Sequence, residues 1–421
     1  MTFAYRKDVL DSGTRVVSES SPDACSLSLG FYVGVGASCE PQDLGGVSHF
    51  IEHILFKGTR RRSSYEIANA LESVGGSIDA FAGRETTAFV SRCLPEHLRR
   101  SVDVLSDMFC RPSMRRDAIE VEKRVIFEEI RNFEDTPEEV VHELLARSVW
   151  GSNPMANPIL GSMKSVGRFG RESLLDFFKS FYVSPNTIVA ACGRVDHPRL
   201  VEYVSGMLKI PGPKKLPALG RYPGALPRIH HENRKVAQCY ICLGTEAPPY
   251  ADNKRYRAIV LSLLLGGGMT SRLFQEVREK LGLAYSVYCS CEFYRRTGIF
   301  VIFLAVDPKK ARLAVNQVSK ELKRLKSRGL RKGELKSVKQ QLKGSMILGL
   351  ESTAARMNRL ARQEFYLNEH HSVDKSLRKV MSVSGDAIEQ EAKRLFDPAR
   401  FSLVTVAPPG TARPAKSDLD F

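Results

Sequence analysis

An internal repeat limits the fold of this chain more than any other feature of its sequence. Residues 25–36 and residues 236–244 both alternate apolar residues with small or polar ones, which is typical of a strand with one buried face. Each segment is followed by a polar loop, two helical stretches, a pair of predicted strands and an amphipathic helix. The repeat therefore predicts two similar structural units in one chain.

We expect an α+β fold with two homologous domains, each a mainly antiparallel β-sheet covered by helices. Residues 211–228 separate the two copies and contain five prolines and three glycines without hydrophobic periodicity, which is typical of a linker. The predicted domains are therefore 1–210 and 229–421. The first copy contains a histidine pair that the second copy lacks, so only the first copy has a candidate metal site.

The composition and the cysteines indicate a globular protein of a reducing compartment. The chain has 421 residues, 43% of them hydrophobic, which is enough for two or more domains. Its nine cysteines are odd in number and scattered, which favours reduced thiols and a cytoplasmic location. The beginning of the sequence has no apolar region typical of a signal peptide, and no window approaches ~18 consecutive apolar residues, so we expect no membrane span.

The basic charge and one cysteine pair need separate interpretation. Much of the net charge of +16 is concentrated in residues 321–345, where a basic surface could bind nucleic acid, anionic lipid or an acidic substrate. No nucleic-acid motif accompanies this charge, so we interpret it as the solvated face of two helices and expect no nucleic-acid partner. Cys239 and Cys242 lie in an apolar run that predicts a strand, and no second pair follows at zinc-ribbon spacing.

The stretch HFIEH contains the histidine pair of the first copy, His49 and His53. Apolar residues around it follow helical spacing, and positions i and i+4 of a helix lie on one face about one turn apart. Both imidazoles could therefore bind one metal ion, with Glu52 near the same face. The alternative is a pair of ordinary surface histidines beside a solvated glutamate.

A catalytic zinc ion usually has three protein ligands, so a metal site needs a third residue from another element. The best candidate stretch is residues 118–140, which is rich in carboxylates and has helical periodicity. Glu122 and Glu129 lie seven residues apart within it and so share one helical face. Glutamates on helices are usually solvated, and the spacing alone does not choose between these two.

The combined motifs resemble those of the pitrilysin/insulinase (M16) family of metallopeptidases. H-x-x-E-H inverts the H-E-x-x-H order of common zinc proteases and is known as the inverzincin motif. SHFIEHILFKGT, followed by EKRVIFEEI, is similar to the family's pattern, and the similarity continues through ANPILGSMKSV and FYVSPNTIVAACGRVD to LGGGMTSRLFQEVREKLGLAYSVY. The subgroup that it most resembles is the short processing-peptidase type, represented by the catalytic subunit of the mitochondrial processing peptidase and bacterial relatives.

The resemblance implies a role for each residue of the candidate metal site. His49, His53 and Glu129 would be the ligands of one Zn²⁺ per chain, in an inverzincin (LuxS-metallohydrolase-like) fold. Glu122 would be a carboxylate that orients the site from behind the ligands. Glu52 would be the general base, because it adjoins a ligand without being one.

The resemblance also implies that the domain 1–210 is the catalytic, zinc-binding one. The domain 229–421 would be inactive itself and would contribute substrate contacts, and a partner chain is implied as well. Arg278 and Tyr285 match the family's Arg–Tyr pair, which helps hold the substrate or its transition state. Because one chain supplies two of the family's four domains, we expect a homodimer or a heterodimer with a related subunit. Short, extended or unfolded peptides are the expected substrates, and zinc-dependent endopeptidase activity is the expected function.

Residues 77–89 occupy the place where the family binds extended peptides as an added strand. Three residues depart from the family's usual pattern. Asp79 stands where asparagine is common, Phe89 where tyrosine is common, and Asn157 where arginine is usual. These departures concern the substrate preference.

A non-catalytic subunit of the same fold is the main alternative function. Inactive members of such families usually lose a histidine or the glutamate of H-x-x-E-H. This chain keeps all three residues together with Glu129, Arg278 and Tyr285. The sequence therefore favours an active enzyme.

Overall fold

The computed structural model describes residues 3–212, 224 and 227–421, and it contains two compact units. The first unit comprises Met1–Arg131, Asn157–Gly220 and Gly349–His370. The second comprises Asn132–Ala156, Arg221–Leu348 and His371–Phe421. The expected linker, 211–228, lies largely outside the described residues.

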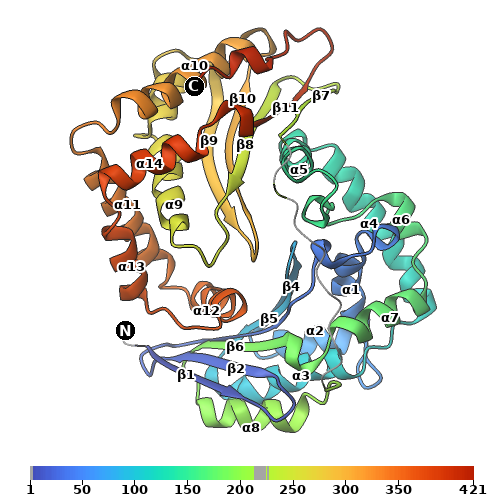
Figure 1. Cartoon of the computed structure of the whole chain (residues 1–421). Coiled ribbons are helices and arrows are strands. Elements are labelled where there is room, and N and C mark those ends of the chain that lie inside the picture. The colour runs from blue at the N-terminus through green and yellow to red at the C-terminus, as the bar shows by residue number, and fades with distance from the viewer. Residues whose placement is uncertain (1–2, 213–223, 225–226) are drawn as a thin grey trace. The chain divides into compact units, whose positions relative to one another are not determined.

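The first unit contains a six-stranded sheet. Only β2 and β6 pair in parallel, and the other neighbours are antiparallel, as the sequence predicted. The strand β4 lies at one edge of this sheet (Figure 1). In spatial order the strands are β1 (Ala4–Val9), β2 (Arg15–Ser20), β6 (Thr187–Gly193), β3 (Leu27–Val33), β5 (Thr87–Cys93) and β4 (Ser77–Ala82).

The second unit repeats this topology in five strands, which confirms the predicted repeat. Its single parallel pair, β7 with β11, again lies beside a run of antiparallel strands. The edge strand β9 occupies the place that β4 has in the first sheet. In spatial order the strands are β7 (Ile229–Asn233), β11 (Ser402–Ala407), β8 (Cys239–Ala247), β10 (Gly298–Val306) and β9 (Ala284–Phe293).

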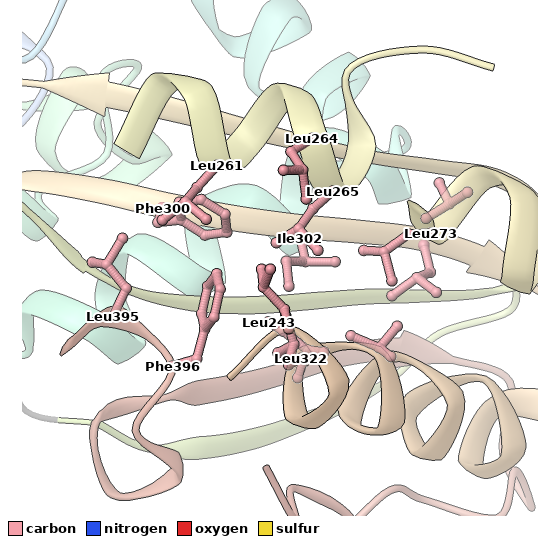
Figure 2. Packing of buried hydrophobic residues seen from close by; sticks show 14 of the residues in the cluster. Leu243, Leu261, Leu264, Leu265, Leu273, Phe300, Ile302, Leu322, Leu395 and Phe396 are labelled. Carbon is pink, nitrogen blue, oxygen red and sulfur yellow. The ribbon is translucent and has the colours of Figure 1, made fainter. Parts of the chain in front are cut away.

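Each sheet has a main helical layer on one face. In the first unit this layer contains α1 (Val47–Leu55), α2 (Ser64–Glu72), α3 (Leu98–Cys110), α4 (Arg116–Glu134), α6 (Met163–Gly167), α7 (Arg171–Phe181) and α8 (His197–Met207). In the second it contains α9 (Lys254–Gly266), α10 (Ala311–Arg328), α11 (Glu334–Gly349), α13 (Val373–Met381) and α14 (Gly385–Leu395). Figure 2 shows the leucines of α9 packed against Phe300 and Ile302 of β10.

The opposite face of each sheet is covered by one helix from the other half of the sequence. The helix α12 (Thr353–Leu367) packs on β2, β3 and β6 of the first sheet, and α5 (Pro137–Trp150) packs on β8 and β11 of the second (Figure 1). The compact units therefore differ from the continuous domains 1–210 and 229–421, because each sheet must bury a second apolar face.

Local signals explain several element boundaries. Ser63 and Glu66 form a capping box at the start of α2. The candidate stretch 118–140 divides at Pro137, which begins α5 at a position where proline is tolerated. Residues 271–284 include a π-helical segment, Phe274–Glu279.

Two further predictions concern the cysteines and the membrane. Cys239 and Cys242 both lie in β8, but they belong to the cores on opposite faces of the second sheet. They point away from each other because side chains alternate along a strand. Within the described part of the chain, no helix combines the length and the apolar character needed to span a membrane.

Candidate metal centre

The helix α1 holds the two histidines of the motif on one face. His49 and His53 lie one turn apart, with ring centroids separated by 4.6 Å. The opposite face of the helix is anchored in the core by Phe50, Ile51 and Ile54, all fully buried. The sequence folds this way because its apolar residues follow helical spacing, and the same spacing sets the imidazoles side by side.

The helix α4 brings Glu129 to the histidine pair. Its Oε2 atom lies 3.7 Å from Nε2 of His49 and 3.5 Å from Nε2 of His53. One ligand atom from each residue lies within 4.8 Å of the other two, and this is the only such trio in the described part of the chain. The structure thus brings together the three residues expected as metal ligands.

The spacing of these atoms fits a single tetrahedral ion. Ligand atoms bound to Zn²⁺ at about 2.1 Å in tetrahedral geometry lie about 3.4 Å apart. The separations of 3.5 and 3.7 Å are too long for hydrogen bonds but match this arrangement. Within the described residues, the buried Glu129 Oε2 has no hydrogen-bond partner, as expected of an atom placed for a cation.

Glu122 lies seven residues before Glu129 on α4. It contacts the Nδ1 side of the His53 ring, whereas Glu129 lies near the Nε2 side. The Oε1 atom of Glu122 lies 3.1 Å from Nδ1 of His53, and its Oε2 atom lies 2.9 Å from Nζ of Lys57. Glu122 is 1% exposed. This contact orients the His53 ring so that Nε2 faces Glu129.

The electrostatics of the two histidines differ. Burial and the neighbouring His53 lower the pKa of His49 to about 3, which keeps its imidazole neutral and able to bind a metal. Burial opposes protonation of His53, but the hydrogen bond to Glu122 and the charge of Glu129 raise its pKa. Burial also acts to raise the pKa of Glu122, yet the hydrogen bonds with His53 and Lys57 hold it below its usual value.

Glu52 lies on α1 next to His53. Burial raises the pKa of its carboxyl group, and the charges of Glu129 and Asp79 act in the same direction. The backbone N–H of Ala82, the last residue of the edge strand β4, donates a hydrogen bond to it. Glu52 therefore lies between the candidate ligands and the sheet edge.

Arg278 and Tyr285 lie together in the second unit. Arg278 belongs to the π-helical segment, and its guanidinium carbon lies 6.0 Å from the ring centroid of Tyr285 and 4.8 Å from that of Phe274. Tyr285 is the second residue of β9 and is 74% exposed. The two side chains therefore lie near each other, and their contact with the substrate stays a prediction.

The three departures from the family's pattern have different surroundings. Asp79 is exposed on β4. Phe89 is fully buried on β5 between the rings of Phe56 and Phe109, so it is a core residue rather than a substrate contact. The side-chain amide of Asn157 donates to the Ala37 carbonyl oxygen at 3.0 Å.

One residue beside the site was missed by the sequence analysis. Glu40 is 4% exposed, and its carboxylate accepts hydrogen bonds from the backbone N–H groups of Gly46 and Ser48 at the start of α1. A single glutamate in a loop has no periodicity, so no local pattern indicated it.

Comparison with known proteins gives matches along most of the chain. Residues 15–163 match the family model described as insulinase (peptidase family M16), and residues 168–342 match the model of the peptidase M16 inactive domain. An uncharacterized zinc protease of Streptomyces coelicolor is 36% identical over 96% of this chain and 89% of its own length. The uncharacterized zinc protease YmxG of Bacillus subtilis is 32% identical over 95% of this chain and 97% of its own length.

Solved structures share the fold at lower sequence identity. A protease from Helicobacter pylori superposes with a TM-score of 0.90 at 19% identity, over 97% of this chain and 100% of that one. A structure of a peptidase M16 inactive domain from Pseudomonas fluorescens gives a TM-score of 0.88 at 19% identity, with the same coverage. These likenesses confirm the predicted two-unit α+β fold.

Proposed function

The chain belongs to peptidase family M16, the insulinase family, and on this premise we propose that it is a zinc-dependent endopeptidase of short, extended or unfolded peptides. The observation that carries the proposal is the convergence of His49, His53 and Glu129 beside Glu52. Two imidazoles and one carboxylate are a donor set that Zn²⁺ accepts with one position left open.

The proposed ligands are Nε2 of His49, Nε2 of His53 and Oε2 of Glu129. A zinc ion bound there would polarise the scissile carbonyl group and make a water molecule more acidic. His53 keeps its orientation through Glu122, which in turn contacts Lys57. The neutral state of buried His49 supports its role as a ligand.

Glu52 is the proposed general base. Its carboxylate takes the proton of the attacking water and later delivers that proton to the amine of the leaving peptide. The raised pKa of Glu52 supports this role, because a carboxyl group with a raised pKa returns a proton to the amine more readily. Its hydrogen bond from Ala82 holds it at the end of β4.

The proposed substrates are extended peptides that add a strand beside β4. Among the described residues this strand pairs only with β5, so no neighbouring strand covers its outer edge. Arg278 and Tyr285 are proposed to hold the substrate or stabilise the developing oxyanion.

The expected dimer and the cytoplasmic location also remain proposals. The four-domain arrangement of the family supports a homodimer or a heterodimer with a related subunit. All nine cysteines are unpaired, which agrees with a reducing compartment.

Digestion of a mixed peptide library, read by mass spectrometry, tests the proposal. Wild type should cut peptides, and a chelator should stop it. Glu52→Gln should keep zinc and lose turnover by on the order of 10²–10⁴-fold, because the proton carrier is gone. His49→Ala should lose the metal. Full activity of Glu52→Gln would contradict the assigned base, and a zinc-loaded wild type that cuts nothing would indicate a missing partner or a scaffold.

A further inference from the structure

The first turn of α1 carries His49 but has no capping side chain of its own. The helix begins at Val47, after Gly46 with φ +90°. The first backbone N–H groups of a helix have no acceptor within the helix, so this turn needs acceptors from elsewhere. His49 is the third residue of α1, and its position therefore depends on groups outside the helix.

Glu40 supplies these acceptors. The Gly46 N–H donates to Oε2 of Glu40 at 2.7 Å, and the Ser48 N–H donates to Oε1 at 2.8 Å. A negative charge beside a helix N-terminus is also favoured by the helix dipole. One carboxylate thus joins the residue before the helix to the residue next to His49.

The backbone at Leu160 and Gly161 passes close to Gly45 and Gly46, and it also limits the position of the first turn of α1. A Cβ atom on Gly46 would lie 2.6 Å from the carbonyl oxygen of Leu160, and one on Gly161 would lie 2.2 Å from that of Gly45. Gly46 and Gly161 both have positive φ angles, which glycine adopts without strain. The first turn is therefore held between this backbone segment and the Glu40 carboxylate.

Glu40 is itself anchored to the hairpin that joins β4 and β5. It follows a short 3-10 turn, η1 (Ala37–Cys39). Two backbone N–H groups of this turn donate to the carbonyl oxygens of Gly83 and Arg84, at 3.0 and 2.8 Å. Glu40 thus connects α1 to the end of the proposed substrate-binding strand.

The burial of Glu40 indicates a role besides stability. Burial raises the pKa of its carboxyl group to about 7, although two backbone N–H groups donate to it. Because the pKa of this group is higher in the folded state than its unfolded value of 4.5, its ionisation lowers the free energy of unfolding. This loss grows as the pH rises from 4.5 through about 7. A neutral side chain would avoid this cost.

We infer that Glu40 is a positioning residue of the metal site, which caps the first turn of α1 against the β4–β5 hairpin and so directs Nε2 of His49 toward Glu129. The inference rests on the proposed function, because it assumes that a metal binds at His49. Glu40 acts through the backbone of α1 rather than on the metal.

Zinc affinity of Glu40→Gln, measured by competition with a chromophoric chelator, tests this role. The amide keeps the shape of the side chain but offers one oxygen, so one N–H of the turn faces an amide nitrogen. We expect zinc binding to weaken by on the order of 10- to 100-fold, as when other supports of a metal ligand are removed. The matched control is Glu19→Gln, which alters a buried carboxylate of the same unit that contacts α12 and not α1. Its zinc affinity should equal that of wild type.

Wild-type zinc affinity in Glu40→Gln would overturn the inference. An equal weakening in Glu19→Gln would overturn it too, because the loss would then reflect general destabilisation. If Glu40→Gln does not fold, Glu40→Asp carries the same test, since a carboxylate one methylene shorter cannot reach both N–H groups. Failure of the wild type to bind zinc would instead contradict the proposed function, so the two failures are distinguishable.

Discussion

The imidazole of His53 is contacted on both of its nitrogens. Glu122 Oε1 lies 3.1 Å from Nδ1, and Glu129 Oε2 lies 3.5 Å from Nε2. A carboxylate beside Nδ1 favours the tautomer that carries its hydrogen there, which leaves the lone pair of Nε2 for a metal. Lys57 holds Glu122 in turn.

Replacing Glu122 by glutamine should therefore weaken zinc binding. The amide can present its nitrogen to Nδ1, and it removes the charge that contacts Lys57. We expect a loss on the order of 10- to 100-fold in affinity, measured by chelator competition. Glu128→Gln is the control, because it makes the same change on the same helix at a side chain that is 65% exposed. A similar loss in both variants would refute the specific role of Glu122.

The residues of this centre were predictable to different degrees. His49 and His53 follow from a local motif, because a helix places positions i and i+4 together. Glu129 needed the resemblance as well, because helical spacing alone did not separate it from Glu122. Glu40 could not be predicted, because its role depends on backbone N–H groups that only the folded loop brings to it.

At the scale of one element, α12 contacts the first sheet through ion pairs whose carboxylates are buried. In Glu19 of β2, the Oε2 atom lies 3.1 Å from Nη1 of Arg356. Its Oε1 atom lies 3.6 Å from Nη1 of Arg359 and 2.9 Å from Nε2 of His370. Glu364 of α12 lies 2.8 Å from Lys7 of β1. Both carboxylates are buried, so removing one of them is costly, because its basic partners would be left unpaired.

Glu19→Gln should lower the free energy of local opening of α12 by on the order of 3 kcal/mol, the usual cost of removing one partner from a buried ion pair. Hydrogen exchange of the α12 amides, read by mass spectrometry, measures this opening. Asp23→Asn is the control, since Asp23 is exposed in the same unit. Unchanged protection of α12 in Glu19→Gln would show that apolar packing alone holds the helix.

The same cluster predicts a dependence on pH. Burial acts to raise the pKa of Glu19, but the hydrogen bonds with His370 and Arg356 and the charge of Arg359 hold it below 4.5. The stabilisation that ionised Glu19 provides is therefore fully present above pH 4.5. It is lost as the pH falls through the pKa of Glu19 in the folded state. Protection of α12 in the wild type should fall between pH 7 and pH 3, after correction for intrinsic exchange rates. A smaller decrease is expected in Glu19→Gln, and an equal decrease would contradict the assignment.

Local signals specified many elements but not their partners. The capping box placed the start of α2 because all its atoms lie within four residues. The amphipathic patterns of α5 and α12 predict helices with one buried face, but they do not say which sheet covers that face. The choice depends on contacts between residues hundreds of positions apart, and a single sequence does not display these.

At the scale of the whole molecule, the repeat predicted the two sheets but not the exchange of helices. Matching strand patterns led to matching topologies, since a similar order of elements folds alike. The apolar face of the first sheet is completed by Met357, Leu360 and Ala361 of α12. That of the second is completed by residues of α5, among them Val141 and Leu145.

A chain divided within the expected linker should therefore remain associated. Without α12, residues 1–210 would expose the face formed by Val17, Tyr32 and Ile188, and burial of Met357 and Leu360 alone is worth about 4 kcal/mol. Residues 229–421 would lack α5 in the same way. When the two halves are produced together, a tag on one should retain the other, and the pair should bind zinc. Each half produced alone should aggregate or unfold without a cooperative transition. A stable, zinc-binding monomer of 1–210 would show that the exchanged helices are dispensable and that the continuous domains are the true folding units.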